Sequence, residues 1–208
     1  MIMTYGEPKT GVVQGVPMRA PKTWFISDTH FCSNNIIKYC HRPFKDADEM
    51  NEEMVRRWNE VVQPQDTVYH LGDFVMEQSE QIPRFLERLN GHIILVRGNH
   101  ETRRKLAVLA QYPEKVEIRD IAYLQYKKLF FVMCHMPMTN PDFLDMVVQD
   151  NSEVVMMHGH VHDKVPFFTP DTHSFNVSVD VIDFRPVDID TVYEMVKRHF
   201  IEKGVWRG

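Results

Sequence analysis

Five short segments of the chain place potential metal ligands directly after apolar runs. They combine aspartate and histidine side chains with one asparagine, and glycine accompanies them in three of the segments. In chain order the segments are Asp28-Thr29-His30, Gly72-Asp73, Gly98-Asn99-His100-Glu101, His135 and His158-Gly159-His160-Val161-His162. Carboxylate, imidazole and amide ligands together suit borderline divalent ions such as Mn²⁺, Fe²⁺, Ni²⁺ or Zn²⁺. The pattern therefore indicates a site for divalent cations.

Alternating strands and helices must position the first three segments. Short apolar runs lead to Asp28, Asp73 and Gly98, and amphipathic helical periodicity fills the stretches between them. Strands are predicted over 23–27, 67–71 and 92–96, helices over 46–61, 80–89 and 102–111, and a polar loop after the first strand. This order favours an α/β fold with parallel strand pairing. Because ligands bind beyond the carboxyl ends of parallel strands, we expect the segments to meet there.

The second half of the chain is richer in strand patterns. Hairpin strands are predicted over 118–126 and 128–134, further strands over 152–157 and 175–181, and a last helix over 189–200. Asp180 and Asp183 are interpreted as strand-end or turn residues. No internal repeat or linker divides the chain. We therefore expect one domain over 22–208, preceded by an irregular arm over 1–21 that is rich in glycine and proline.

The overall composition limits the classes of partner. The formal net charge is −5, from 24 basic and 29 acidic residues, which argues against a large basic face for nucleic acid. Three cysteines are an odd number and make no obvious disulfide framework. No stretch has the apolar length of a membrane span, and the first residues lack the pattern of a secretory signal. We expect a cytoplasmic protein with no membrane partner.

The ordered series of short motifs resembles the signature of the calcineurin-like metallophosphoesterase superfamily. The motifs are D-x-H, G-D, G-N-H-E, H and G-H-x-H, and they span Asp28 to His162, about two thirds of the chain. The residues around them, 35–37, 42–44 and 69–74, further resemble small bacterial and phage members. The resemblance implies a four-layer α/β/β/α sandwich, in which two mixed β-sheets are flanked by helices.

The resemblance also implies a role for each motif residue. One ion would be held by Asp28, His30 and His162, the other by Asn99, His135 and His160, and both by Asp73. His100 would stay off the ions as the catalytic residue, near the phosphate. A hydroxide between the two cations would attack phosphorus in line with the leaving group. Manganese is the expected metal, with iron, nickel or zinc as alternatives.

Residues outside the motifs are expected to contact substrate or to support the ligands. Asn35 and Arg42 follow the first motif closely enough to reach substrate, and an arginine could fork onto a phosphate. His70, Glu101 and His158 are interpreted as supporting residues rather than ligands. Similar proteins often have Gly-His where this chain has Cys32-Ser33, which leaves the inherited substrate preference open.

The leading hypothesis is a dinuclear phosphodiesterase acting on a small phosphoester. A phosphomonoesterase or protein phosphatase is an alternative, although the phosphoprotein phosphatase motif continues Gly-Asp with Asp-Arg-Gly, whereas Gly72-Asp73 is followed by Phe-Val-Met-Glu here. A nuclease is a second alternative that the acidic net charge does not favour. A non-catalytic scaffold would be expected to lose ligands, and none is missing. The oligomeric state is left open.

Overall fold

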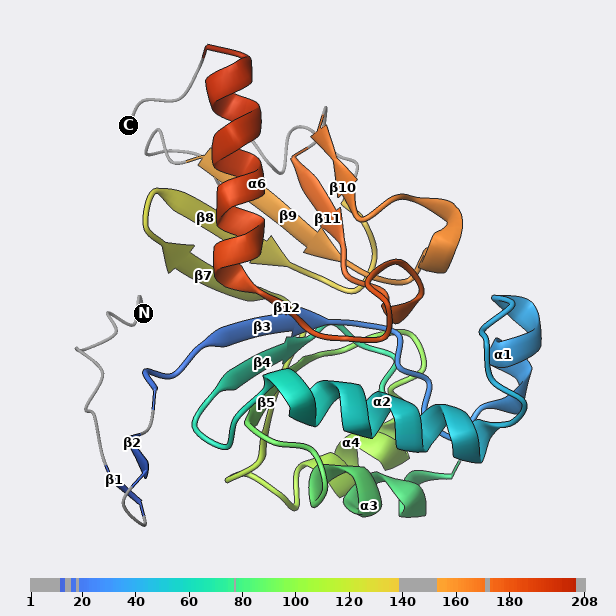
Figure 1. Ribbon diagram of the computed structural model, residues 1–208. Coiled ribbons are helices and arrows are strands. Elements are labelled where there is room, and N and C mark those ends of the chain that lie inside the picture. Colours follow the sequence, from blue (N-terminus) through green and yellow to red (C-terminus); the bar gives the residue numbers. More distant parts are fainter. Residues whose placement is uncertain are drawn as a thin grey trace.

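Two five-stranded sheets form the centre of the computed structural model (Figure 1), which describes residues 12–13, 16–17, 19–76, 78–138, 153–170 and 173–204. The first sheet has the order β12 (Val187–Asp188), β3 (Thr23–Ile26), β4 (Thr67–His70), β5 (His92–Val96), β6 (Val116–Arg119). The second has the order β10 (Phe168–Thr169), β11 (Ser174–Asn176), β9 (Glu153–His158), β8 (Leu129–Met133), β7 (Ala122–Tyr126).

Both sheets are mixed. In the first, β3, β4, β5 and β6 are parallel and only β12 is antiparallel to its neighbour. In the second, β8, β9 and β11 are parallel, whereas the edge strands β7 and β10 are antiparallel. The carboxyl ends of β3, β4 and β5 therefore lie at one edge, as the alternation of elements predicts. Two mixed sheets with flanking helices confirm the expected α/β fold.

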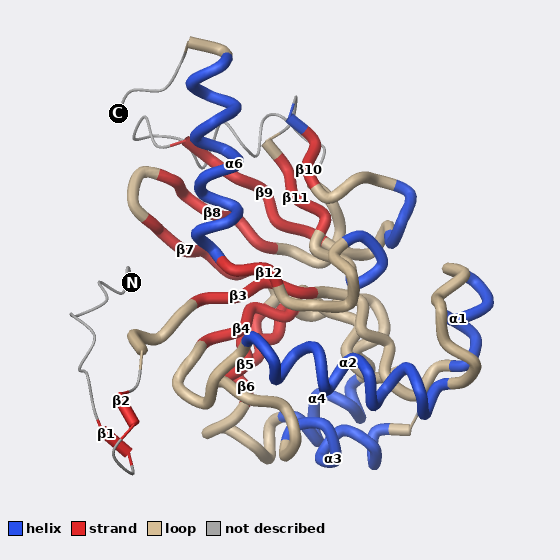
Figure 2. Tube along the Cα trace, viewed as in Figure 1, coloured by secondary structure: helices blue, strands red, loops and turns tan. Residues whose placement is uncertain are grey.

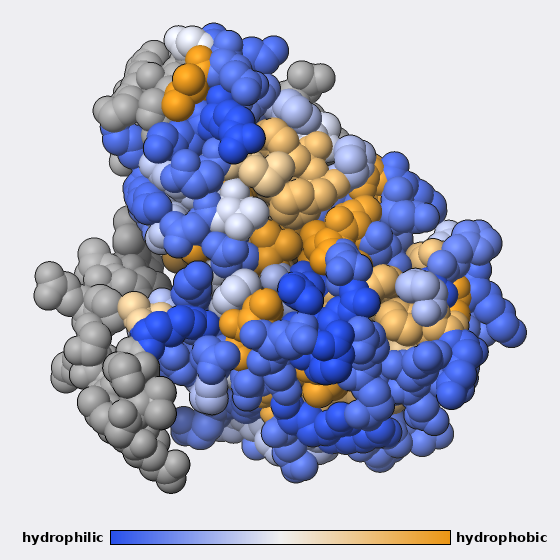
Figure 3. Space-filling model, viewed as in Figure 1, coloured by the Kyte–Doolittle hydropathy of each residue, from blue (hydrophilic) through white to orange (hydrophobic). Residues whose placement is uncertain are grey.

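Helices α2 (Ala47–Val61), α3 (Ile82–Leu86) and α4 (Arg103–Leu109) cover the outer face of the first sheet (Figure 2). Helix α2 begins where the Asp46 side chain accepts the N–H of Glu49, and it buries Met54 and Trp58 against the sheet. The outward side of α2 is mostly hydrophilic, and apolar surface is concentrated between the parts of the molecule that contain the two sheets (Figure 3). This amphipathic division confirms the helix predicted from the periodicity.

A second apolar cluster fills the space between the sheets. The rings of Phe25 on β3 and Phe131 on β8 stack with their centroids 5.8 Å apart. Helix α6 (Ile189–Glu202) adds Val192, Val196 and Phe200 to the same cluster. Trp24 and Ile26 point instead into the cluster under the helices, so β3 is buried on both faces. A strand of this kind is expected to be apolar, as its three buried residues Trp24, Phe25 and Ile26 are.

Three predicted elements differ from the structure. The single strand predicted over 118–126 is two strands, because β6 pairs with β5 in the first sheet and β7 pairs with β8 in the second. The strand predicted over 175–181 ends at Asn176 and continues as a 3-10 turn, η4 (Val179–Val181). The predicted polar loop contains a helix, α1 (Asn34–Tyr39), because the Ser33 side chain caps it by accepting the Ile36 N–H.

The remaining elements are short. A 3-10 turn, η1 (Ser79–Gln81), precedes α3, and another, η2 (His162–Lys164), begins at the last residue of the G-H-x-H motif. In the predicted arm, β1 (Val12–Val13) pairs with β2 (Val16–Pro17), and the rest of 1–18 lies outside the described residues. The division into an arm and one domain stays a prediction. Over the described ranges, the helices are all too short or too polar to cross a membrane.

Candidate metal centre

Turns at the carboxyl ends of β3 and β4 carry Asp28, His30 and Asp73. All three residues have left-handed backbone conformations, with φ of 57°, 46° and 58° respectively. Residues other than glycine adopt this conformation uncommonly, because it costs about 1–3 kcal/mol and persists only where the surroundings impose it. Here the surroundings do so, because the Asp28 N–H bonds the Gly72 carbonyl at 3.0 Å and the His30 N–H bonds the Asp73 carbonyl at 2.9 Å.

The second sheet supplies the remaining histidines. His135 follows β8, and His160 and His162 follow β9, again with left-handed φ values of 69° and 52° for the latter two. The His160 N–H donates to both carboxylate oxygens of Asp28, at 3.1 and 3.0 Å. Gly159 permits this contact, because a Cβ there would collide with the Asp28 carboxylate. The ligand turns of the two sheets therefore pack directly on each other.

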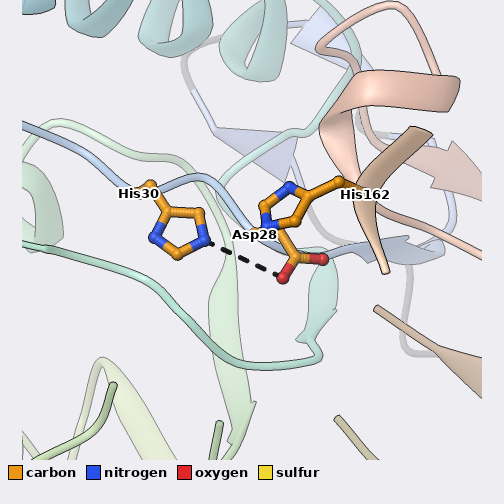
Figure 4. Close-up of side chains that lie close together, drawn as sticks. All are labelled: Asp28, His30 and His162. Atoms are coloured by element: carbon orange, nitrogen blue, oxygen red, sulfur yellow. Dashed lines mark ion pairs between the residues drawn. The ribbon is translucent and has the colours of Figure 1, made fainter. Parts of the chain in front are cut away.

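The first group of potential ligands is Asp28, His30 and His162 (Figure 4), whose ligand atoms lie within 4.8 Å of one another. The His30 Nε2 is 4.0 Å from Asp28 Oδ1, and the His30 and His162 rings stack at 5.2 Å. Both ring nitrogens of His30 are buried without a hydrogen-bond partner among the described residues. Because an unpaired buried polar group costs about 1–3 kcal/mol, this ring fits a site completed by a cation.

The second group is Asp73, His135 and His160, whose ligand atoms also lie within 4.8 Å of one another. The Asn99 Oδ1 is 2.8 Å from His135 Nε2 and 3.0 Å from His160 Nδ1, so the amide belongs to the same group. The His135 Nδ1 lies 2.7 Å from the Leu71 carbonyl. A ring held this way at Nδ1 presents Nε2 to a cation.

Asp73 joins the two groups. Its Oδ2 is 3.5 Å from His30 Nε2 in the first group and 3.4 Å from His135 Nε2 in the second. Its Oδ1 accepts the His100 N–H at 3.0 Å. One carboxylate oxygen is therefore held by the backbone, while the other faces both groups. The structure thus brings all seven predicted ligands together.

Burial and nearby charges set the protonation states of these groups. Burial raises the pKa of Asp28 to about 6, against the lowering effect of His135 and His162, and it lowers the pKa of His30 to about 3. Burial would also raise the pKa of Asp73, but the hydrogen bond and charge of His135 outweigh it and lower that pKa. A neutral His30 and an ionised Asp73 are the forms that bind cations.

His100 stands at the rim of the centre rather than inside either group. Its side chain is 41% exposed, and its Nε2 is 3.9 Å from Asp73 Oδ2. A cleft of about 450 Å³ opens above the groups and is lined by His30, Asp73, His100 and His162, among others. Asn35 also lines this cleft, which places it where a substrate contact was expected.

Arg42 does not take the expected place in the cleft. Its side chain is fully buried. Its guanidinium donates to the carbonyls of Asp28 and Thr29, to both Asp180 carboxylate oxygens, and to the Met50 sulfur. All five N–H groups are therefore used. The expectation that Arg42 contacts a phosphate is wrong, because sequence proximity to a motif does not show on which side of the turn a side chain lies.

Two supporting carboxylates have larger roles than the sequence indicates. Glu101 accepts the backbone N–H groups of Asp73 and Phe74, each at 2.9 Å, and of Gly98 at 2.7 Å, so it ties the turns after β4 and β5 together. Asp180, interpreted as a turn residue, lies 2.7 Å from His162 Nδ1. The G-N-H-E motif could have pointed to Glu101, whereas no spacing in the sequence points to Asp180.

Comparisons with known proteins agree with this geometry. Residues 22–177 match the family model described as the calcineurin-like phosphoesterase superfamily domain. An uncharacterized protein of Methanocaldococcus jannaschii is 38% identical over 187 residues, which cover 87% of this chain and 94% of that protein. The crystal structure of a protein of unknown function from Aquifex aeolicus has 25% sequence identity and a TM-score of 0.67, and the match covers 84% of this chain and 99% of that one.

Proposed function

The chain belongs to the calcineurin-like phosphoesterase superfamily, and from that premise we propose that it is a phosphodiesterase with two divalent cations. The observation that carries the proposal is the position of Asp73 Oδ2, within 3.5 Å of a histidine nitrogen from each ligand group. Among the carboxylate, imidazole and amide side chains of the two groups, an ionised carboxylate is the one best suited to contact two cations. Manganese is the first metal to test, with iron, nickel and zinc as alternatives.

The residues present fit such ions. Asp28, His30 and His162 would hold one cation, Asn99, His135 and His160 the other, and Asp73 both. The unpaired ring nitrogens of His30 and the donor set of carboxylate, imidazole and amide support this assignment. Two cations bound there would supply Lewis-acid stabilisation of the phosphoryl charge and would lower the pKa of an attacking water.

His100 is the residue that we propose acts on the substrate. Its exposed imidazole faces the cleft, while its backbone N–H holds Asp73 Oδ1. From that position the ring can donate a hydrogen bond to a phosphoryl oxygen or a proton to the leaving alkoxide. Because it lies outside both ligand groups, we expect its removal to affect turnover more than cation binding.

The surface on the two sides of His100 favours a diester over a monoester. The cleft above the two ligand groups extends towards Asn35, Tyr39 and Lys164. A second hollow of about 520 Å³ shares Asn99 and His100 with it and extends towards Thr102 and Arg104. A phosphodiester carries an organic group on each side of phosphorus, and both groups could be accommodated.

The test is hydrolysis of bis-p-nitrophenyl phosphate and of p-nitrophenyl phosphate by metal-free protein reloaded with Mn²⁺. We expect cleavage of the diester to exceed that of the monoester and EDTA to abolish it. His100→Asn should lower kcat by about 10²–10⁴-fold with both ions retained. The matched control is His92→Asn, at the opposite end of β5, which should change neither. Inactivity with every divalent ion, or loss of the ions from His100→Asn, would contradict the proposal.

A further inference from the structure

A buried ion pair lies behind the first ligand group. The guanidinium of Arg42 binds the carboxylate of Asp180 through two hydrogen bonds, Nε to Oδ1 at 2.8 Å and Nη2 to Oδ2 at 2.9 Å. The Arg42 side chain is 0% exposed and the Asp180 side chain 3%. Such an arrangement is geometrically specific, and each partner compensates the buried charge of the other. The pair joins η4 to the loop that follows α1, across 138 positions of the chain.

The remaining donors of Arg42 hold the turn that carries Asp28 and His30. Nη2 donates to the Asp28 carbonyl at 2.8 Å, and Nη1 donates to the Thr29 carbonyl at 3.0 Å. These carbonyls belong to a turn with left-handed residues, which cannot be satisfied by the regular pairing of a strand. One guanidinium therefore fixes both the backbone of this turn and the carboxylate of Asp180.

Asp180 in turn holds His162. Its Oδ2 lies 2.7 Å from His162 Nδ1 and also accepts the hydroxyl of Ser178 at 3.1 Å. With Nδ1–H directed at the carboxylate, Nε2 is the nitrogen left for a cation beside Asp28 and His30. A carboxylate partner of this kind fixes both the tautomer and the direction of a ligating ring.

We propose that Asp180 and Arg42 are a positioning pair for the cation site formed by Asp28, His30 and His162. The pair sets the direction of the His162 ring and links it to the turn of the other two ligands. Within the described residues, neither member hydrogen-bonds a side chain of Asp73, His135 or His160. The effect is therefore confined to one of the two sites, and the inference rests on the proposed dinuclear function.

Asp180→Asn tests the pair with almost no change of shape. The amide has one acceptor oxygen and one donor nitrogen. In the Oδ1 position the nitrogen would face the Nε–H of Arg42, and in the Oδ2 position it would face Nη2 of Arg42 and His162 together. If it faces His162, Nδ1 must accept, the proton moves to Nε2, and that nitrogen can no longer bind a cation. We expect the Kd of this single site to rise about 10–100-fold, while that of the other site is unchanged.

The assay is titration of the full metal-free chain with Mn²⁺ by calorimetry, together with metal counting after dialysis. The matched control is Asp183→Asn, which makes the same change of charge three positions further on, at a side chain that is 81% exposed and paired with Arg57. The control should bind both ions as the unaltered chain does. Asp180→Glu keeps the negative charge opposite Arg42 and should recover part of the affinity that Asp180→Asn loses.

A double-mutant cycle shows whether Asp180 acts through His162. In a His162→Ala background, Asp180→Asn should cause no further loss of cation affinity. Equal weakening of both sites, or unchanged affinity at both, would overturn the positioning role while leaving the dinuclear proposal intact. If Asp180→Asn fails to fold, Asp180→Glu decides, because selective weakening of one site supports the pair and equal weakening of both overturns it. If the unaltered chain binds fewer than two ions, the proposed function and this inference both fail.

Discussion

Replacing Asp73 with asparagine should weaken both cation sites at once. The Oδ1 position is fixed by the His100 N–H at 3.0 Å, and the Asp73 backbone is fixed by Glu101. An asparagine must keep its oxygen in that place to accept the same hydrogen bond. Its NH₂ group then occupies the place of Oδ2, between His30 and His135. A nitrogen without a lone pair for a cation would therefore replace the oxygen that faces both groups.

The size of the effect follows from what is lost. Removing a residue that only orients a ligand costs about 10–100-fold in affinity, and Asp73→Asn removes a ligand from each ion. We therefore expect the Kd of each ion to rise by about 100-fold or more, equivalent to about 2.8 kcal/mol per ion. Calorimetric titration of metal-free protein with Mn²⁺ measures both constants, and thermal unfolding of the metal-free variant checks its fold.

Asp28→Asn is the matched comparison for this prediction. Asp28 belongs to the first group only, so its substitution should weaken one ion and leave the other at its original affinity. If Asp73→Asn kept either ion at its original affinity, the assignment of Asp73 to both ions would be wrong. If Asp28→Asn and Asp73→Asn gave the same pattern of losses, the division into two groups would be wrong.

Three further predictions concern protons, stability and steric fit. Burial lowers the pKa of His162, but its hydrogen bonds to Asp180 and Cys40 and the charge of Asp28 together outweigh this and raise the pKa to about 10. Cation binding at pH 7 should therefore release a proton, measurable by calorimetry in buffers of different ionisation enthalpy. The raised pKa also stabilises the metal-free fold fully below about pH 6.5 and less as pH rises through about 10. Asp66 has a lowered pKa because its hydrogen bonds outweigh the raising effect of burial, so its contribution to stability should be present at neutral pH and lost in acid. In urea denaturation, Asp66→Asn should therefore cost about 1–3 kcal/mol at pH 7 and less at pH 3. Gly159→Ala should displace the Asp28 carboxylate and lower the free energy of unfolding by about 1–3 kcal/mol. Metal counting should then show loss of the ion next to Asp28. Full retention of that ion would contradict the predicted steric clash.

The ligand turns were predictable because two independent patterns coincide there. Each of the strands β3, β4 and β5 is an apolar run buried on both faces, and each run ends shortly before a polar motif. Parallel pairing then brings the three ends to one edge, whatever the details of the helices between them. The placement of Asp28, Asp73 and Asn99 followed from this rule alone.

Features that depend on tertiary contacts could not be predicted in the same way. The periodicity over 118–126 is continuous, yet the chain leaves one sheet at Arg119 and enters the other at Ala122, because the pairing partner changes from β5 to β8. Arg42 and Asp180 meet across 138 positions, with no motif to relate them. Their buried pairing is visible only once both sheets are in place.

The division of the centre between two sheets has a consequence for folding. Asp28 and His160 are 132 positions apart in the chain, and their turns touch only when the sheets have docked. A chain that has formed one sheet alone presents half a coordination sphere. Cations would therefore bind only once the two sheets have docked, and their binding free energy would stabilise the docked arrangement. The concentration of free metal would then contribute to the stability of the docked arrangement of the two sheets.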